Sequence, residues 1–341
     1  MSKKNLFICQ LGEYFDVFLP EVRKSSPNTI SAYAYSFTLF FQFLFDEKDL
    51  PHHIITYKNF TAALFDEYIL WLENERNYSV SSIHQRITAI TAFLKYASRR
   101  EMSALSAYSV SKGTELPKTA RTEFPYFTKE EMAILLALPN PHKYLGGRDL
   151  VFLSFLYDTA ARADEMCKVR VCDVKFGAPT KVRLHGKGDK IREIPISDET
   201  ADLVRYHLKE QLLQGKDCKE KPLFSSQTNE KMTTACVRSI VEKYVGIAIA
   251  LNPKLFTEKS YSPHSFRHSK AVHMVEAGVN LIYIRNFLGH ATISSTEIYA
   301  RVGQSAVTKA LTERKIPRIA ANTPQSEKSN FTVPDFIARA K

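Results

Sequence analysis

Along the first hundred residues, apolar and polar side chains recur with the period of an α-helix. Within residues 28–45, apolar side chains lie three and four positions apart, which places them on one helical face: Ile30, Tyr33, Ala34, Phe37, Phe41 and Leu44. Residues 60–77 and 79–100 repeat this pattern. We therefore expect a helical N-terminal domain, assigned to residues 1–103, whose apolar stripes form its core.

The periodicity stops after this region and resumes further along the chain. Residues 104–125 are rich in Ser, Thr, Lys, Gly and Pro and have no apolar period, which is typical of a linker. A second domain, residues 126–302, opens with Thr128 and Glu131 at the spacing of a capping box. It continues mainly as apolar helical segments.

One stretch of the second domain has the period of a β-strand instead. In residues 181–196, apolar and polar side chains alternate on both sides of the turn sequence GKGD. Two alternating segments around a glycine-rich turn predict a β-hairpin with Lys187 at its tip. The expected fold is therefore mainly α-helical with a small β-sheet, divided into a helical N-terminal domain and a mixed α/β second domain.

Composition narrows the class of protein. The chain has 341 residues, of which 44% are hydrophobic, and this suffices for two domains with separate cores. The sequence lacks a signal-peptide pattern and any apolar run as long as a membrane span, so we expect a soluble cytoplasmic protein. Its five cysteines are scattered without a C-x-x-C pair, which favours free thiols in a reducing compartment.

The charge balance indicates a polyanionic partner. Lys and Arg number 47 and Asp and Glu 36, a net charge of +11. Residues 1–125 hold nearly equal numbers of each sign, so the excess lies almost entirely beyond them. Such an excess favours nucleic acid without proving it. In the N-terminal domain, Lys95, Arg99 and Arg100 end a predicted helix and are either phosphate contacts or part of a solvated face.

The second domain contains a cluster of ionisable residues. The sequence SPHSFRHSKA places His264, Arg267 and His268 on one face of a helix that begins at Pro263. By itself the cluster indicates a metal site, an anion site or a coincidence. The two histidines have the spacing of zinc ligands, but the sequence lacks the Glu of an H-E-x-x-H motif.

Other polar candidates are spread along the same domain: Arg162, Glu165, Lys187, His290 and Tyr299. Two arginines can neutralise the charge that develops on a phosphodiester, because guanidinium groups bind oxygen pairs in a fork. A tyrosine, whose pKa is ordinarily about 10, needs a base or electrostatic help to attack. His264 is the candidate base, and Lys187 can protonate the departing oxygen. The set suits metal-free phosphoryl transfer to a tyrosine.

These residues lie in motifs that resemble those of the tyrosine recombinases, the phage-integrase family. Residues 263–302 are similar to the C-terminal signature of that family, with its H-x-x-R motif, L-G-H segment and I-Y pair. Upstream, TAARADEM resembles the first arginine motif, and GKGDKIREIPI resembles the hairpin with the catalytic lysine. The motifs follow the family order over residues 128–302. Two departures are Ala160, where glycine is common, and Phe266, where leucine is usual.

The resemblance implies a role for each matched residue. Tyr299 would attack the scissile phosphate and form a 3′-phosphotyrosyl link, leaving a free 5′-hydroxyl. The remaining residues would assist this step: Arg162 and Arg267 by holding phosphate oxygens, His290 by bonding one of them, Lys187 by protonating the leaving group, His264 as base, and Glu165 by orienting the site. No metal or nucleotide cofactor is implied, because the tyrosine ester retains the energy of the broken bond.

The resemblance also implies partners. The protein would clamp double-stranded DNA at an inverted-repeat core site, with the helical N-terminal domain on one face, and would act at the nucleoid. Four copies would exchange strands between two synapsed sites, and accessory proteins are a further expected class of partner. The tail, residues 303–341, carries a short apolar patch that is expected to dock on a neighbouring protomer: Phe331, Val333, Phe336 and Ile337.

Two other functions fit parts of the pattern. A type IB topoisomerase uses nearly the same residues but relaxes DNA alone, without strand exchange. A DNA-binding regulator would keep the fold without the chemistry, and the intact residue set argues against it. Single residues also have structural interpretations, since Arg162 beside Asp164 and Glu165 can form an ion pair and Lys187 can simply be solvated.

Overall fold

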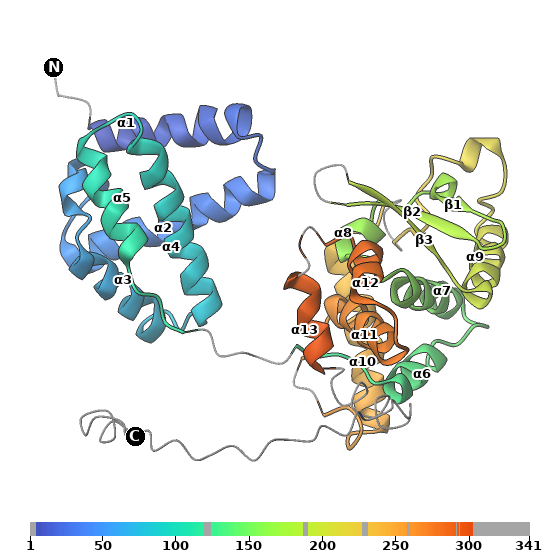
Figure 1. Ribbon diagram of the computed structural model, residues 1–341. Coiled ribbons are helices and arrows are strands. Elements are labelled where there is room, and N and C mark those ends of the chain that lie inside the picture. The colour runs from blue at the N-terminus through green and yellow to red at the C-terminus, as the bar shows by residue number, and fades with distance from the viewer. Residues whose placement is uncertain are drawn as a thin grey trace, which may run out of the picture. The chain divides into compact units, whose positions relative to one another are not determined.

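The computed structural model of the protein describes residues 5–118, 124–186, 190–226, 231–257, 260–290, 292 and 294–302. The chain divides into two compact units, Met1–Glu123 and Phe124–Lys341, and Figure 1 labels the elements of each. Among the described helices, none combines the length and the apolar character needed to cross a membrane.

The first unit is a bundle of helices. Its elements are α1 (Leu6–Glu13), a π-helical turn (Tyr14–Val22), α2 (Pro27–Lys48), two short 3₁₀ turns (His52–Ile54 and Tyr57–Asn59), α3 (Ala62–Asn74), α4 (Val80–Ala97) and α5 (Ser103–Gly113). Ser26, Thr61 and Ser79 cap α2, α3 and α4, each accepting a hydrogen bond from a backbone N–H of the first turn. The three predicted helices are confirmed, and their aromatic residues form a dense core.

The prediction of a linker over residues 104–125 is wrong for its first part. Helix α5 continues to Gly113 and packs on α4 within the first unit. Its buried residues are Ala104, Ala107 and Ser111, at helical spacing but with small side chains. A search for large apolar residues misses such a stripe, although small residues let two helices approach closely.

The second unit holds the remaining helices and the sheet. Its elements are α6 (Lys129–Ala137), α7 (Tyr144–Thr159), α8 (Ala163–Met166), a 3₁₀ turn (Val171–Asp173), β1 (Val174–Lys175), β2 (Lys181–His185), β3 (Ile191–Pro195), α9 (Asp198–Glu210), a 3₁₀ turn (Lys216–Cys218), α10 (Thr234–Leu251), α11 (Pro263–Glu276), α12 (Leu281–Leu288) and α13 (Ser294–Val302). The predicted capping box at α6 is present, with Thr128 and Glu131 bonded to each other's backbone.

The strands form an antiparallel sheet in the order β1-β2-β3. The predicted hairpin is confirmed as β2 and β3, in which Val182 pairs with Ile194 and Leu184 with Arg192. Strand β1 has two residues, too few for an alternating pattern to reveal it. The tip of the hairpin, with Lys187, lies outside the described residues.

Helix α11 lies at the centre of the second unit and contacts α7, α10, α12 and α13 (Figure 1). It begins where the sequence predicts, with Pro263 in its first turn and Ser262 bonded to Ser265 in a capping arrangement. Most of its residues are buried, including Phe266 and Arg267. A charged residue therefore enters the core on a helix that four other helices contact.

Candidate functional site

Arg267 is buried on α11 and is held by backbone carbonyls rather than by a carboxylate. Its side chain donates to the oxygen of Ala160 at 2.9 Å and to that of Leu288 at 2.6 Å, and the residue is 3% exposed. Burial, followed by the charges of Arg162 and Arg192, lowers its pKa to about 9, so it stays protonated at neutral pH. Neutral carbonyls orient the guanidinium without cancelling its charge.

The two carbonyls lie at the ends of two helices. Ala160 is the C-cap of α7, with φ 47° and ψ 34°, and Gly289, the C-cap of α12 just after Leu288, has φ 67°. Both are left-handed conformations that expose the last carbonyls of a helix, where a cation is favourable. The alanine bears a strain of about 1 kcal/mol that glycine avoids, which explains why glycine suits this position.

Glu165 is a fully buried carboxylate beside Arg162. Its exposure is 0%, and it accepts hydrogen bonds from the backbone N–H of Arg162 at 2.7 Å and from Nη1 of the same residue at 3.0 Å. Arg192 donates two more, at 2.7 and 2.8 Å. Burial opposes ionisation, but the hydrogen bonds and charges of Arg192 and Arg162 outweigh it and lower the pKa of Glu165.

Tyr299, on α13, is buried with 1% exposure. Its hydroxyl shares a hydrogen bond of 2.9 Å with Nδ1 of His268. The ring of Phe124 meets it edge-on at 5.2 Å, and the ring of His290 lies parallel to it at 6.4 Å, both between centroids. Burial raises the pKa of the hydroxyl, while the charges of Arg267 and then Arg162 oppose that rise. The guanidinium groups therefore favour the phenolate.

The histidines near Tyr299 are held in the neutral form. Burial lowers the pKa of His290 to about 4, with further contributions from Arg267, Arg162 and Arg192. The pKa of His268 is also lowered to about 4, by burial and then by its neighbours His264, Arg267 and His290. A neutral imidazole can accept a proton, so His268 is a chemically competent partner for the phenol.

The structure brings five predicted residues together in the second unit: Arg162, Glu165, Arg267, His290 and Tyr299. His290 also shares a hydrogen bond of 3.0 Å with Thr296 Oγ1. His264 is exposed, and its ring lies 6.0 Å from that of His268. The hydroxyl of Tyr299 thus contacts the second histidine of the pair.

The three basic residues predicted to contact DNA lie at the end of α4. Lys95 and Arg99 line a cavity of about 680 Å³ in the first unit, together with Arg23 and Lys112. Arg100 instead stacks on the ring of Tyr96, with its guanidinium carbon 3.9 Å from the centroid. Four cations thus rim one groove, while Arg100 also has a packing role.

Sequence reasoning missed the parts played by His268, Arg192 and Phe124. The helical face did predict that His268 would lie beside His264, but spacing alone does not tell which histidine meets the tyrosine. Arg192 continues the inward alternation of Ile194 and had the signal of a charge at a core-facing position. Phe124 follows residues without periodicity, and nothing local indicates its contact with Tyr299.

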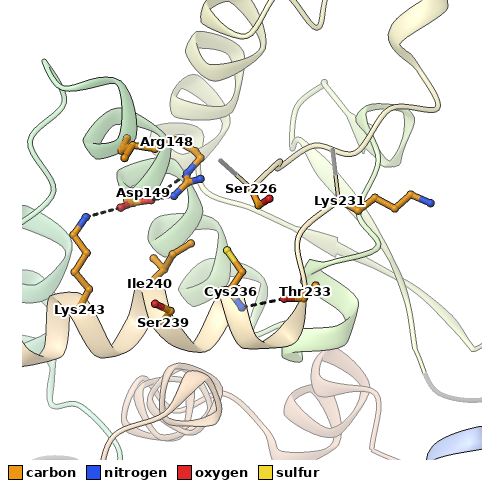
Figure 2. Close-up of a pocket in the computed structure, with 10 residues that line it drawn as sticks. Arg148, Asp149, Ser226, Lys231, Thr233, Cys236, Ser239, Ile240 and Lys243 are labelled. Atoms are coloured by element: carbon orange, nitrogen blue, oxygen red, sulfur yellow. Dashed lines mark hydrogen bonds and ion pairs between the residues drawn. The ribbon is translucent and has the colours of Figure 1, made fainter. Parts of the chain in front are cut away.

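A second polar cluster lies elsewhere in the unit, beside a cavity of about 390 Å³ (Figure 2). The carboxylate of Asp149 accepts from Arg148 at 2.7 Å, from Lys243 at 3.1 Å and from Tyr244 at 3.0 Å. These contacts join α7 to α10, and the cavity contains none of the predicted site residues. Across the described part of the chain, no three His, Cys, Asp or Glu residues are grouped to hold a metal ion.

Comparisons with known proteins match both units of the chain. Residues 125–305 match the phage integrase family, and residues 10–114 match the phage integrase SAM-like domain. The chain is 31% identical over 337 residues to a putative integrase/recombinase, y4rC, of Sinorhizobium fredii, covering 98% of this chain and 97% of the relative. It is 26% identical to the tyrosine recombinase XerC of Chlamydia caviae, covering 84% and 92%.

Solved structures share the fold. The XerH site-specific recombinase, bound to a palindromic difH substrate in a post-cleavage complex, has a TM-score of 0.69 and 18% identity, covering 88% of this chain and 84% of XerH. The Tn1549 transposon integrase, in complex with transposon right end DNA, has a TM-score of 0.66 and 15% identity, covering 91% and 98%. At these identities the likeness concerns the fold.

Proposed function

Since the chain belongs to the phage integrase family and is a tyrosine-type site-specific DNA recombinase, we propose that it cleaves and rejoins duplex DNA through Tyr299. In the proposed step, the Tyr299 oxygen bonds to the scissile phosphorus as the bond from phosphorus to the 5′ oxygen breaks. The phenolic proton passes to a base, and the 5′ oxygen takes a proton from an acid. The product is a 3′-phosphotyrosyl ester and a free 5′-hydroxyl, and reversal of the step rejoins a strand.

The observation that carries this proposal is that Tyr299 lies within range of the charges of two arginines whose guanidinium groups are held by hydrogen bonds. Arg267 presents an uncancelled charge beside the buried phenol, and Arg162 has a second guanidinium with 30% of its side chain exposed. Both charges act on the Tyr299 hydroxyl. A phosphate placed between them would have its developing negative charge stabilised without a metal.

The proton transfers are assigned to histidine and lysine. His264 remains the predicted base, and His268 is a second candidate because its Nδ1 lies within hydrogen-bond distance of the Tyr299 hydroxyl. Neutral His290 can donate a hydrogen bond to a phosphate oxygen. The predicted acid, Lys187, lies outside the described residues and keeps its role as a prediction from the hairpin motif.

Cleavage also requires a rearrangement around the nucleophile. Tyr299 is 1% exposed, with Phe124 against its ring and His268 bonded to its hydroxyl. A phosphate in DNA cannot reach a buried oxygen, so α13 or Phe124 must move when DNA binds. We assign this structure to a resting state in which His268 holds the tyrosine.

DNA is the partner of the recombinase, and the remaining contacts are proposals. Lys95 and Arg99, with Arg23 and Lys112 in the same groove, supply positive charge for the phosphate backbone. An inverted-repeat core site, a tetramer in the synaptic complex and accessory proteins are proposed on the family relationship. The proposed docking segment, Phe331 to Ile337, lies outside the described residues.

The test is capture of the covalent intermediate. The DNA site is first identified by isolating fragments of the source genome that become covalently attached to the wild-type protein. A nicked duplex that contains this site is then incubated with protein in the presence of EDTA. The 3′ end should become attached to wild-type protein and to Tyr283→Phe, an exposed tyrosine control on α12, but not to Tyr299→Phe. An adduct with Tyr299→Phe would overturn the assignment of the nucleophile.

The same preparation separates the proposal from its alternatives. Strand exchange between two copies of the captured site supports recombination, whereas relaxation of plasmids of any sequence without exchange would indicate a topoisomerase. Binding without any denaturant-resistant adduct would indicate a regulator.

The proposed phosphate contacts are tested by measuring DNA affinity at a series of salt concentrations. The variants Lys95→Gln and Arg99→Gln should each reduce the slope of log affinity against log salt concentration by about one, because each removes one phosphate contact.

A further inference from the structure

Arg192 is a largely buried arginine at the site, and the reaction described above gives it no part. It lies on β3 with 12% of its side chain exposed, and its two terminal nitrogens bond the two oxygens of Glu165 at 2.7 and 2.8 Å. This is the parallel, two-bond geometry in which arginine and carboxylate orient each other most strictly. Glu165 is in turn bonded to the backbone and guanidinium of Arg162.

The side chain of Arg192 also lies against two turns that lead to other site residues. A Cβ added at Gly289, which precedes His290, would be 3.1 Å from Cδ of Arg192. One added at Gly186, which precedes the hairpin tip, would be 3.2 Å from the Glu165 carboxylate and 3.7 Å from Arg192. Both turns therefore approach the ion pair so closely that only glycine fits without a shift.

Stability alone does not account for an arginine here. The Nε of Arg192 is buried and has no hydrogen-bond partner among the described residues, which costs about 1–3 kcal/mol. Replacing a buried ion pair by apolar side chains is commonly neutral or stabilising. The arrangement is better explained by what it holds in place.

We propose that Arg192 is a positioning residue for DNA cleavage: its fork fixes Glu165, and Glu165 fixes the guanidinium of Arg162 that faces the scissile phosphate. This inference rests on the proposed function, because Arg162 has a phosphate to face only if the chain cleaves DNA. The fork, and not merely the positive charge, is the required property.

Three variants and one control test the proposal. Arg192→Lys keeps the charge and loses the fork, and Arg192→Met loses both. Glu165→Gln removes the negative charge and replaces one of the two acceptor oxygens by an NH₂ donor. Arg183→Met is the matched control, since Arg183 lies on β2 of the same sheet, paired with Glu193 at 3.2 Å and 38% exposed. Single-turnover formation of the covalent adduct is measured on the nicked duplex, with DNA affinity and thermal unfolding measured in parallel.

Both Arg192 variants should lower the adduct rate about 100-fold or more at unchanged DNA affinity, because a misplaced guanidinium no longer stabilises the transition state. Arg183→Met should stay within about threefold of wild type. An Arg192→Lys variant at the wild-type rate would overturn the proposal, since charge alone would then suffice. If Arg192→Met does not fold, the Arg192→Lys comparison decides.

Two further measurements separate positioning from general support of the fold. The combined Arg192→Lys and Glu165→Gln variant should be about as slow as the slower single variant, because both changes release the same group; rates that fall by the product of the single effects contradict the proposal. The second measurement uses a methylphosphonate at the scissile position, which removes the charge of one non-bridging oxygen.

On this neutral substrate, loss of a guanidinium should matter less. The ratio of the adduct rate on phosphodiester to the rate on methylphosphonate should therefore be at least about tenfold smaller in Arg162→Met and in Arg192→Lys than in the wild type. Equal slowing of the Arg192 variant on both substrates would assign Arg192 to the fold alone. Wild-type protein that forms no adduct with Tyr299 would instead refute the proposed function, and the two failures are thus distinguishable.

Discussion

The second unit contains two buried carboxylates, Asp149 and Glu165. Both are stabilised by neighbouring cations, but the two sites differ in how much positive charge remains. Each is almost fully buried, at 1% and 0% exposure, and each is bonded to an arginine. At Asp149 the cations are Arg148 and Lys243, and Arg148 also donates to the carbonyl of Ser225. At Glu165, Arg162 and Arg192 are bonded to the carboxylate, while the nearby Arg267 is bonded only to carbonyls.

The difference lies in how much positive charge the protein leaves uncancelled. Around Glu165, Arg162 and Arg192 are bonded to one carboxylate and Arg267 lies nearby. Burial and, after it, the charges of these arginines lower the pKa of His290, and burial with the charges of Arg162 and Arg192 lowers that of Arg267. Around Asp149, half of the Lys243 side chain is exposed, where water screens it. A surplus of cations that are kept from solvent indicates a site prepared for an anion, whereas a network whose second cation is screened by water indicates a structural one.

The largest expected effect concerns Asp149. Asp149→Ala leaves the largely buried Arg148 without its carboxylate partner and should lower the free energy of unfolding by about 3–5 kcal/mol. Chemical denaturation measures this, with Asp202→Ala, an exposed residue paired with Arg205, as a control that should change it by less than about 1 kcal/mol. Adduct formation per folded molecule should be unchanged, and a selective loss of cleavage would show that Asp149 is part of the site.

Glu165→Gln should have the opposite profile. The amide keeps the shape of the carboxylate but not its charge, so Arg162 and Arg192 lose their common anchor, and the adduct rate should fall about 100-fold. Glu193→Gln is the control, because Glu193 is exposed and bonded to Lys175 and Arg183 on the outer part of the sheet. A wild-type adduct rate in the Glu165 variant would show that Glu165, like Asp149, has no part in cleavage.

Burial of the site histidines, together with the surplus charge, predicts a dependence of stability on pH. The pKa values of His268 and His290 are about 4 in the folded protein, against about 6.5 for a free histidine. Between these values the unfolded chain binds more protons, so the free energy of unfolding should fall as pH decreases from 6.5 to 4, by about 1–3 kcal/mol after allowance for solvent. Buried His207 and His273 act in the same direction.

Denaturation at a series of pH values measures this slope. His268→Phe removes one titrating group and should flatten the curve in this window, whereas a variant at a surface histidine such as His142→Asn serves as the control. An unchanged slope in His268→Phe would mean that the histidine is not held neutral beside Tyr299.

The smallest expected effect is that of Ala160→Gly. Glycine relieves a left-handed strain of about 1 kcal/mol, but it loses a buried methyl group and makes the unfolded chain more flexible. The free energy of unfolding should change by less than about 1 kcal/mol, and the adduct rate should be unchanged, because the carbonyl that accepts from Arg267 remains. A large loss of activity would indicate that the methyl group itself sets the position of that carbonyl.

Local patterns predicted most elements and fewer of the site contacts. Strong periodicity located α2 and α4, and alternation located the hairpin, because burial of one face dictates these repeats. Helix α5 was missed since its buried side chains are small. The contact of Tyr299 with His268 joins residues 31 positions apart in the chain, and no local pattern encodes which partner a buried hydroxyl finds once four helices have packed.

The anchoring of Arg267 by main-chain oxygens has a consequence for how this protein tolerates mutation. Every amino acid brings the same carbonyl, so no replacement at positions 160 or 288 deletes an acceptor; it can only tilt one. Substitutions at those two positions should therefore have a small effect on the hydrogen bonds of Arg267, whereas no other side chain can replace the guanidinium itself. The orientation of the Arg267 guanidinium therefore depends on the path of the backbone, and side-chain substitutions that leave this path unchanged also leave the orientation unchanged.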